Sequence, residues 1–97
     1  MTKRTPSPID LIIGQNLRRI REELRVSRRI LAEPIGISHQ QIEKCERGIN
    51  RIPASHLYLY SHLLNRSIHD FFDGITFEIL NETCSERLSQ LQPLSEK

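Results

Sequence analysis

The segment from residue 27 to residue 48 restricts the fold of this chain more than any other part of the sequence. Ser27 and Ser38 each precede a stretch with helical spacing of apolar residues, and a serine there caps a helix by accepting a bond from a backbone N–H. Gly36 lies between the two stretches and is typical of a tight turn. The segment therefore predicts two short helices joined by a turn. The residues expected on their inward faces are Ile30, Leu31, Ile35, Ile37, Ile42 and Cys45.

The second short helix, expected over residues 39–47, carries polar side chains on its first turns, facing away from the apolar residues. Glutamine offers a flat pair of donor and acceptor groups that matches the major-groove edge of adenine. Two short helices around a glycine turn, with amides and a cation at the tip of the second, are typical of a DNA-reading helix-turn-helix. An ordinary surface role is the alternative for any one glutamine, and the motif tip argues against it more strongly for Gln40 than for Gln41. The expected base readers are His39, Gln40, Gln41 and Lys44.

Further short pieces of sequence surround this motif in a fixed order. They are Ile13-Gly-Gln-Asn-Leu-Arg-Arg-Ile-Arg21, Leu31-Ala32, Gly36-Ile-Ser38, Ile42-Glu-Lys-Cys-Glu-Arg-Gly48 and Ile52-Pro-Ala-Ser-His-Leu57. Together they resemble the Cro/cI-type helix-turn-helix regulators, the XRE family, over residues 9–74. Two positions depart from the family pattern: Arg28 replaces the usual glutamine, and Pro34 replaces a residue with an N–H near the end of the first motif helix.

The resemblance implies a five-helix, lambda-repressor-like domain that regulates transcription and generally acts as a dimer. It also implies that His39, Gln40 and Lys44 occupy base-facing positions. In the family, an arginine late in the first helix pairs with a glutamate near the end of the recognition helix, and Arg21 and Glu46 occupy these positions. We therefore expect a partly buried ion pair between them, which would lock the first helix to the third.

The basic residues are concentrated in the first part of the chain. Residues 1–30 hold eight basic and three acidic residues, whereas residues 75–97 hold two basic and four acidic residues. This asymmetry favours a basic face for a polyanion such as DNA. Phosphate contacts would fix the docking of the motif and supply most of the affinity. The expected contacts are Arg18, Arg19, Ser27, Arg28, Ser38, Asn50 and Arg51, with the serines marking helix starts whose backbone N–H groups could face phosphates.

Helical spacing without any alternating strand pattern predicts an all-α fold. Residues 1–8 are expected to form a flexible arm and residues 9–74 the helix-turn-helix domain. Ser55 and Ser67 are expected to cap the last two helices of that domain. The expected helices span residues 8 or 9 to 24, 28–34, 39–47, 56–64 and a short stretch that carries Phe71 and Phe72. Further inward positions are expected for Ile13, Leu17, Ile20, Leu24, Leu57, Tyr60, Leu63 and Leu64.

A C-terminal amphipathic helix is expected over residues 75–92, followed by a loose tail over residues 93–97. Its apolar residues lie on one stripe at intervals of three and four. The stripe either folds back onto the domain's own core or pairs with its twin across a two-fold axis. We favour dimerisation, because the preceding helices already close a domain and the resembling family generally acts as dimers. The stripe consists of Phe77, Leu80, Cys84, Leu88 and Leu91.

The sequence shows none of the local patterns of common catalytic sites, such as a nucleophile elbow, a glycine-rich phosphate loop or an HExxH pair. His56 and His62 are six positions apart, which does not place them on one helix face as metal ligands. Cys45 and Cys84 have no metal-ligand or disulfide-framework spacing, and Cys45 is interpreted as a small core residue. We therefore expect no enzymatic activity, no cofactor and no metal.

No apolar run approaches membrane-spanning length, and no signal peptide is recognisable, so we expect a cytoplasmic protein without membrane contact. The sequence predicts a sequence-specific regulator that binds double-stranded DNA, acts as a repressor, and recognises an inverted-repeat operator as a homodimer. The alternative is an antitoxin or adaptor-type protein-interaction module with the same fold. In that case the C-terminal stripe would bind a protein partner.

Overall fold

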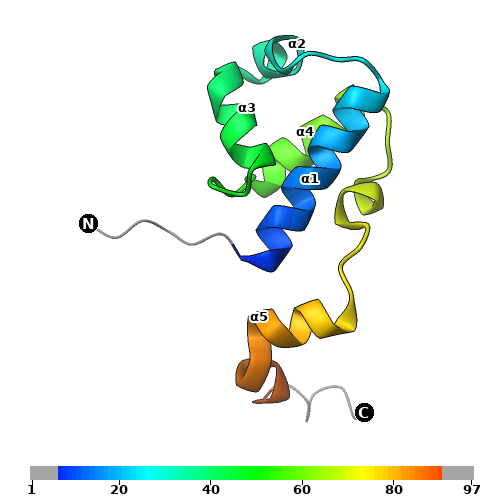
Figure 1. Ribbon diagram of the computed structural model, residues 1–97. Coiled ribbons are helices and arrows are strands. Elements are labelled where there is room, and N and C mark those ends of the chain that lie inside the picture. Colours follow the sequence, from blue (N-terminus) through cyan, green and yellow to red (C-terminus); the bar gives the residue numbers. More distant parts are fainter. Residues whose placement is uncertain (1–6, 91–97) are drawn as a thin grey trace, which may run out of the picture.

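The computed structural model describes the backbone of residues 7–90 and the side chains of residues 7–84 (Figure 1). Across these residues the chain is helical and contains no strand, which confirms the predicted all-α class. Residues 1–6 and 91–97, which include most of the expected arm and the expected tail, lie outside the described part. The elements are α1 (Pro8–Glu23), α2 (Arg28–Ala32), η1 (Glu33–Ile35), α3 (His39–Glu46), α4 (Ala54–Leu63), η2 (Ile68–Phe72) and α5 (Phe77–Gln90), where η denotes a 3-10 helix.

The first helix begins earlier than the predicted arm allows. The Ser7 hydroxyl accepts a hydrogen bond of 3.1 Å from the Asp10 N–H, and Pro8 occupies the first helical position. Proline is favoured there because its φ angle is already helical and its missing N–H would have no partner within the helix. Ser7 and Pro8, at the end of the predicted arm, therefore belong to the start of α1, and the start at Pro8 is one of the two that were expected for this helix.

The turn between the two motif helices forms as predicted. The Ser27 hydroxyl accepts from the Ile30 N–H at 3.1 Å, and Gly36 has a left-handed φ of 84°. The first motif helix is shorter than predicted: α2 ends at Ala32 and a 3-10 helix continues to Ile35. Pro34 explains the difference, because its nitrogen cannot donate to the preceding turn and its ring clashes with the carbonyl there.

The predicted Ser55 cap is wrong. Helix α4 begins two residues earlier than predicted, at Ala54, and Pro53 occupies the cap position without any side-chain hydrogen bond. Pro53 fixes the entry of the chain into the helix and has no N–H of its own to satisfy. The Ser67 cap is confirmed by a 3.2 Å hydrogen bond from the His69 N–H, although the element it starts is the 3-10 helix η2.

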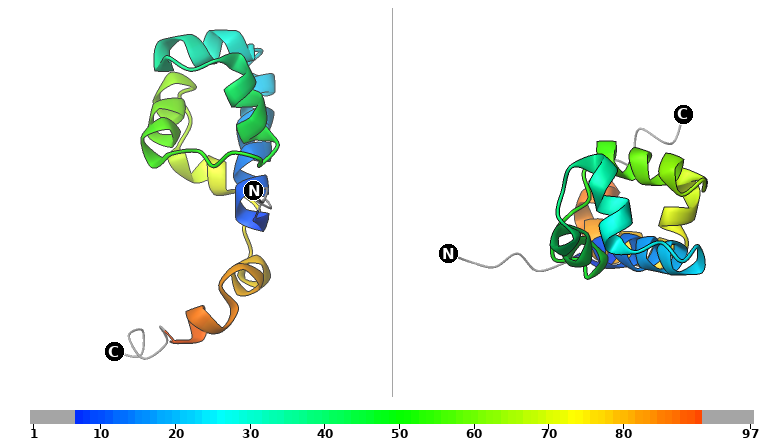
Figure 2. Two further views of the ribbon diagram at one scale, coloured as in Figure 1. Left: turned by 90° about the vertical axis from the view of Figure 1, so that its left-hand side faces the viewer. Right: turned by 90° about the horizontal axis from the view of Figure 1, so that it is seen from above.

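The core lies between α1, α2, α3, α4 and η2 (Figure 2). Three residues predicted to face inward are exposed instead: Leu24 and Leu63 by about two fifths, and Ile30 by 62%. Helix α2 is only five residues long, and Leu31 and Ala32 occupy the side that packs against the body. Helical spacing identifies an apolar stripe but not how much of its width a neighbour covers. The largest fully buried side chains are Tyr60, Phe71, Leu17, Ile20 and Ile42.

Helix α5 projects from the end of the body opposite α2 and contacts α1 (Figures 1 and 2). Asn16 on α1 holds the preceding segment, because its side-chain amide donates to the Phe71 carbonyl at 2.9 Å and to the Asp73 carbonyl at 2.8 Å. On α5 itself, Phe77 is 70% exposed and Leu80 is also exposed. Within the described residues, no helix is long and apolar enough to span a membrane. Two members of the predicted stripe, Leu88 and Leu91, lie beyond the described side chains.

Candidate nucleic-acid interface

The two faces of α3 differ sharply in exposure. Ile42, Cys45 and Glu46 are buried against the body, where α3 packs on α1 and α2. The opposite face belongs to exposed polar residues near the start of the helix, which we call the reader surface. The packing of this buried face fixes the helix backbone that carries the exposed side chains. The reader surface consists of the four predicted base readers, His39, Gln40, Gln41 and Lys44.

Gln41 differs from the other members of the reader surface. Its side-chain oxygen accepts from the Ser38 N–H at 2.9 Å, while the Ser38 hydroxyl accepts from the Gln41 N–H at 3.1 Å. This reciprocal capping box fixes the start of α3. Within the described part of the chain, the side chains of His39 and Gln40 have no hydrogen-bonding partner. The structure therefore gives Gln41 a local structural role and leaves Gln40 available to a ligand.

Helices α1 and α3 approach each other closely at Gly14. A Cβ atom at this position would lie 2.7 Å from the Glu46 carbonyl oxygen and closer still to that of Cys45. Both are backbone atoms, which cannot move aside as a flexible side chain can. Glycine is therefore required at position 14 for this packing, which holds the last turn of α3 against α1.

A buried group of charges lies beside this contact. Arg21 donates from Nε to Glu46 Oε2 at 2.7 Å and from Nη2 to Oε1 at 3.3 Å, and its Nη1 donates to the Val26 carbonyl at 2.9 Å. Arg28 from α2 donates from Nε to Glu46 Oε1 at 2.9 Å. The Glu46 side chain is 1% exposed, that of Arg21 8% and that of Arg28 33%. The structure thus brings Arg21 and Glu46 together and adds Arg28, for which only a phosphate contact had been predicted.

The other side chains predicted to contact phosphates, apart from the two serines, lie in two hollows of the surface. Arg18 and Arg19 line a hollow of about 520 Å³ beside the last turn of α3, where Arg18 pairs with Glu22 at 3.0 Å and Arg19 with Glu23 at 3.3 Å. The hydrogen bond from Arg18 holds the pKa of the Glu22 carboxyl below its ordinary value. Arg18 and Arg19 are therefore remote from the first turn of α3. The hydroxyls of Ser27 and Ser38 act as helix caps.

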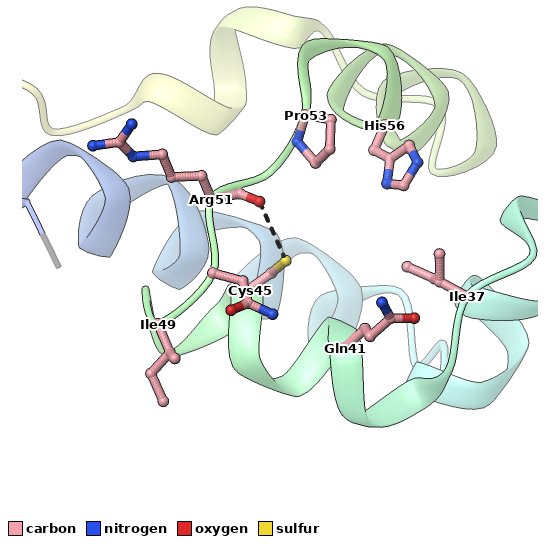
Figure 3. Close-up of a pocket in the computed structure, with 8 residues that line it drawn as sticks. Ile37, Gln41, Cys45, Ile49, Arg51, Pro53 and His56 are labelled. Atoms are coloured by element: carbon pink, nitrogen blue, oxygen red, sulfur yellow. Dashed lines mark hydrogen bonds between the residues drawn. The ribbon is translucent and has the colours of Figure 1, made fainter. Parts of the chain in front are cut away.

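Asn50 and Arg51 lie in the second place, a hollow of about 380 Å³ between α3 and the start of α4. Gln41 enters this hollow from α3 and His56 from α4 (Figure 3). Arg51 also pairs with Asp10 at 3.3 Å, and its guanidinium is largely exposed. The sequence did not indicate His56 as a residue of this hollow. No local pattern could have done so, because only the packing of α4 brings His56 to the same hollow as Gln41.

Cys45 forms part of the floor of the same hollow. Its thiol lies 3.9 Å from the Arg51 carbonyl oxygen, to which it can donate weakly (Figure 3). Burial raises the pKa of the Cys45 thiol, and the charge of Glu46 adds to the effect. The thiol therefore stays protonated at neutral pH and behaves as a small core group. Among the described residues, no group of three or more potential ligands is placed to hold a metal ion.

Comparisons with known proteins agree with this geometry. Residues 12–59 match the helix-turn-helix domain family. An uncharacterised HTH-type transcriptional regulator of Sinorhizobium medicae is 42% identical over 71 residues, which are 73% of this chain and 51% of the relative. A regulator of Rickettsia prowazekii is 43% identical over 69% of this chain and 52% of its own length. The chain thus spans about half the length of these relatives.

A transcriptional regulator in the ATPase CF(0) region of Rhodospirillum rubrum is 43% identical over 74% of this chain and 67% of its own length. Among solved structures, the clp gene regulator ClgR from Corynebacterium glutamicum has a similar fold, with a TM-score of 0.67 and 23% identity. That likeness covers 95% of this chain and 98% of the ClgR chain. The described helices, the exposed first turn of α3 and these relatives lead to one assignment: the chain belongs to the helix-turn-helix transcriptional regulators.

Proposed function

We propose that this protein is a sequence-specific regulator that binds double-stranded DNA through the reader surface. The observation that carries the proposal is the first turn of α3. There His39 and Gln40 are exposed and have no hydrogen-bonding partner among the described residues, while the other end of the helix is held by the buried pair of Arg21 and Glu46. Placed in the major groove, the Gln40 amide offers the paired donor and acceptor that distinguish adenine from other bases. Lys44, one turn later, offers a cation for a guanine or a phosphate.

Phosphate contacts on both sides of α3 would fix the docking without reading sequence. Arg28 lies at the start of α2, and Asn50 and Arg51 lie in the hollow that follows α3. Contacts of this kind supply much of the affinity of DNA-binding proteins and make it depend on salt. His56, which shares that hollow with Gln41 and Arg51, joins the candidates for a backbone contact.

The proposed regulator acts in the cytoplasm as a homodimer that recognises an inverted repeat. The exposed apolar side chains of α5, Phe77 and Leu80, support an intermolecular contact at this helix, because the body leaves them uncovered. Two-fold symmetry would place the reader surfaces in successive major grooves, about 34 Å apart. Occupancy of such an operator would exclude other proteins from the same stretch of duplex, which is the basis for proposing a repressor.

The test is selection of binding sites from a random duplex library, followed by sequencing, with the wild-type chain and with Gln40→Ala. We expect a motif with two-fold symmetry that Gln40→Ala relaxes or abolishes at one position in each half. Gln15→Ala is the matched control, since it also removes an exposed glutamine side chain, but from α1, outside the reader surface. Absence of any enriched motif with the wild-type chain would contradict the proposal.

The exposed face of α5 also favours a second candidate function, an antitoxin or adaptor that binds another protein. Phe77 is the most exposed of the large apolar residues described. In that case Phe77→Asp would abolish binding to the protein partner. Enrichment of a specific duplex by the isolated chain would count against a role limited to protein binding.

A further inference from the structure

The charge group around Glu46 contains more positive than negative charge. Both oxygens of this carboxylate are occupied, Oε2 by Arg21 and Oε1 by Arg21 and Arg28. Arg21 also lies 3.9 Å from Glu22, which pairs with Arg18 at 3.0 Å. Three guanidinium groups therefore face two carboxylates, and one positive charge is left over. Of the two guanidinium groups bound to Glu46, that of Arg28 is the more accessible to a ligand, because the side chain of Arg21 is 8% exposed and that of Arg28 is 33% exposed.

The way in which Arg28 is held leaves its outer nitrogens available. Its one hydrogen bond within the described residues uses Nε, the inner nitrogen of the guanidinium. A guanidinium has five N–H donors in a rigid plane, and the four on Nη1 and Nη2 have no hydrogen-bonding partner among the described residues. These outer nitrogens form the fork that matches the oxygens of a phosphate. Glu46 therefore holds the Nε side of the Arg28 guanidinium, and the side with Nη1 and Nη2 remains available to bind an anion.

From this geometry we infer that Glu46 is a positioning residue: its buried carboxylate presents the Arg28 fork to a phosphate of the DNA backbone. The inference rests on the proposed DNA-binding function and deepens it. Glu46 belongs to α3 and Arg28 to α2, so the contact fixes the phosphate-binding group relative to the helix that carries the reader surface. A shift between the two motif helices would then disturb backbone docking and base reading together.

Simple charge counting makes the opposite prediction for Glu46. Removing a negative charge near DNA would strengthen binding, because the protein then repels the phosphates less. If Glu46 instead positions Arg28, its removal weakens binding, because the fork is no longer held toward the phosphate. The sign of the change therefore separates the two explanations, and a purely structural role for Glu46 would not alter the salt dependence of the folded protein.

The test measures the slope of log K against log salt concentration for a short duplex carrying the most enriched selected sequence. We expect Arg28→Gln to make the slope shallower by about 0.9, the value for one lost phosphate contact. Glu46→Gln should reduce the slope by the same amount, and the double variant should lose no more than either single variant. Glu43→Gln is the matched control, since it removes a carboxylate of the same helix that pairs with Arg47 instead. This control should bind at least as tightly as the wild type.

Arg28→Lys guards against an unfolded Glu46→Gln variant, because it leaves the pair between Arg21 and Glu46 in place. Lysine keeps the charge but not the rigid fork, so we expect weaker binding than in the wild type. An unchanged slope in Arg28→Gln, tighter binding by folded Glu46→Gln, or wild-type affinity and slope in Arg28→Lys would each overturn the inference. If the wild-type chain binds no duplex at all, the proposed function fails together with this inference. If it binds and only the variants disagree, the proposed function stands.

Discussion

The two ends of α3 are built in opposite ways. The first turn carries His39 and Gln40, whose side chains are exposed and make no hydrogen bond or ion pair within the described chain. The last turn carries Cys45 and Glu46, which are buried against α1 at the close approach of Gly14. One end of an eight-residue helix is therefore held by packing and charge, and the other is free to meet a ligand.

This difference explains how so short a helix can recognise a ligand. An isolated helix of this length is unstable in water, so its conformation depends on the body behind it. A helix backbone that is already in place when the ligand arrives loses less conformational entropy on binding. Changes at the buried end should therefore alter stability, and changes at the exposed end should alter recognition alone.

The largest loss of stability is expected from Glu46→Ala, at the buried end. The substitution leaves Arg21 almost fully buried without its carboxylate partner. We expect the free energy of unfolding to fall by about 3–5 kcal/mol, the usual result of removing one member of a buried ion pair. Chemical denaturation followed by circular dichroism measures this directly. Glu43→Ala is the control at an exposed pair and should cost less than about 1 kcal/mol. Equal melting of Glu46→Ala and wild type would show that the charge group does not hold α3.

Gly14→Ala tests the close packing of α1 against the last turn of α3. The new methyl group would collide with backbone oxygens of the last turn of α3, so one helix must move away. We expect a loss of about 1–3 kcal/mol, as for other overpacked sites, although alanine is the better helix former. Gln15→Ala, next in sequence but exposed, provides the baseline in the same denaturation experiment. A stabilised Gly14→Ala protein would mean that α1 and α3 are not in close contact.

Ser38→Ala tests the cap at the start of α3, where the helix follows the Gly36 turn. It removes the hydroxyl that accepts from the Gln41 N–H, so we expect a loss of about 1 kcal/mol. Ser55→Ala is a closely matched control, because that serine also follows a loop but lies inside the first turn of α4 and caps nothing. It should leave the thermal midpoint unchanged. A larger loss for Ser55→Ala than for Ser38→Ala would contradict the assigned helix starts.

Gln40→Ala should have the smallest effect on stability. Its side chain is exposed and unpaired, so the free energy of unfolding should change by less than about 0.5 kcal/mol. Binding to the selected duplex should nevertheless weaken, which calorimetric titration at constant salt can measure. Wild-type affinity and selectivity in this variant would remove the functional distinction between the two ends of α3.

Local features of this chain could be predicted from sequence, and features that depend on packing could not. The caps at Ser27, Ser38 and Ser67 were correct because each hydroxyl bonds to a backbone group two or three residues away. The exposure of Ile30 was missed because helical spacing does not show how far a neighbouring helix extends over a short one. Ser55 was misassigned because Pro53 occupies the cap position and the helix begins at Ala54.

The candidate site shows the same division. The reader surface follows from its position after the Gly36 turn, which is local information. The second partner of Glu46 does not, because Arg28 lies 18 residues away and meets it only through the packing of α2 on α3. His56 likewise lines the same hollow as Gln41 only because of how α4 packs in the folded protein. The helices could be predicted from the sequence, but the contacts between them could be found only from the structure.

The central claim is that DNA meets the exposed end of α3 while the buried end stays as it is. Nuclear magnetic resonance of the labelled chain, titrated with the selected duplex, tests it most directly. We predict large shifts for the side-chain amide of Gln40 and for the backbone at the starts of α2 and α3, with small shifts for Gly14 and the backbone of α5. Shifts confined to α5, with the Gln40 amide unmoved at saturation, would contradict the account and indicate a different binding surface.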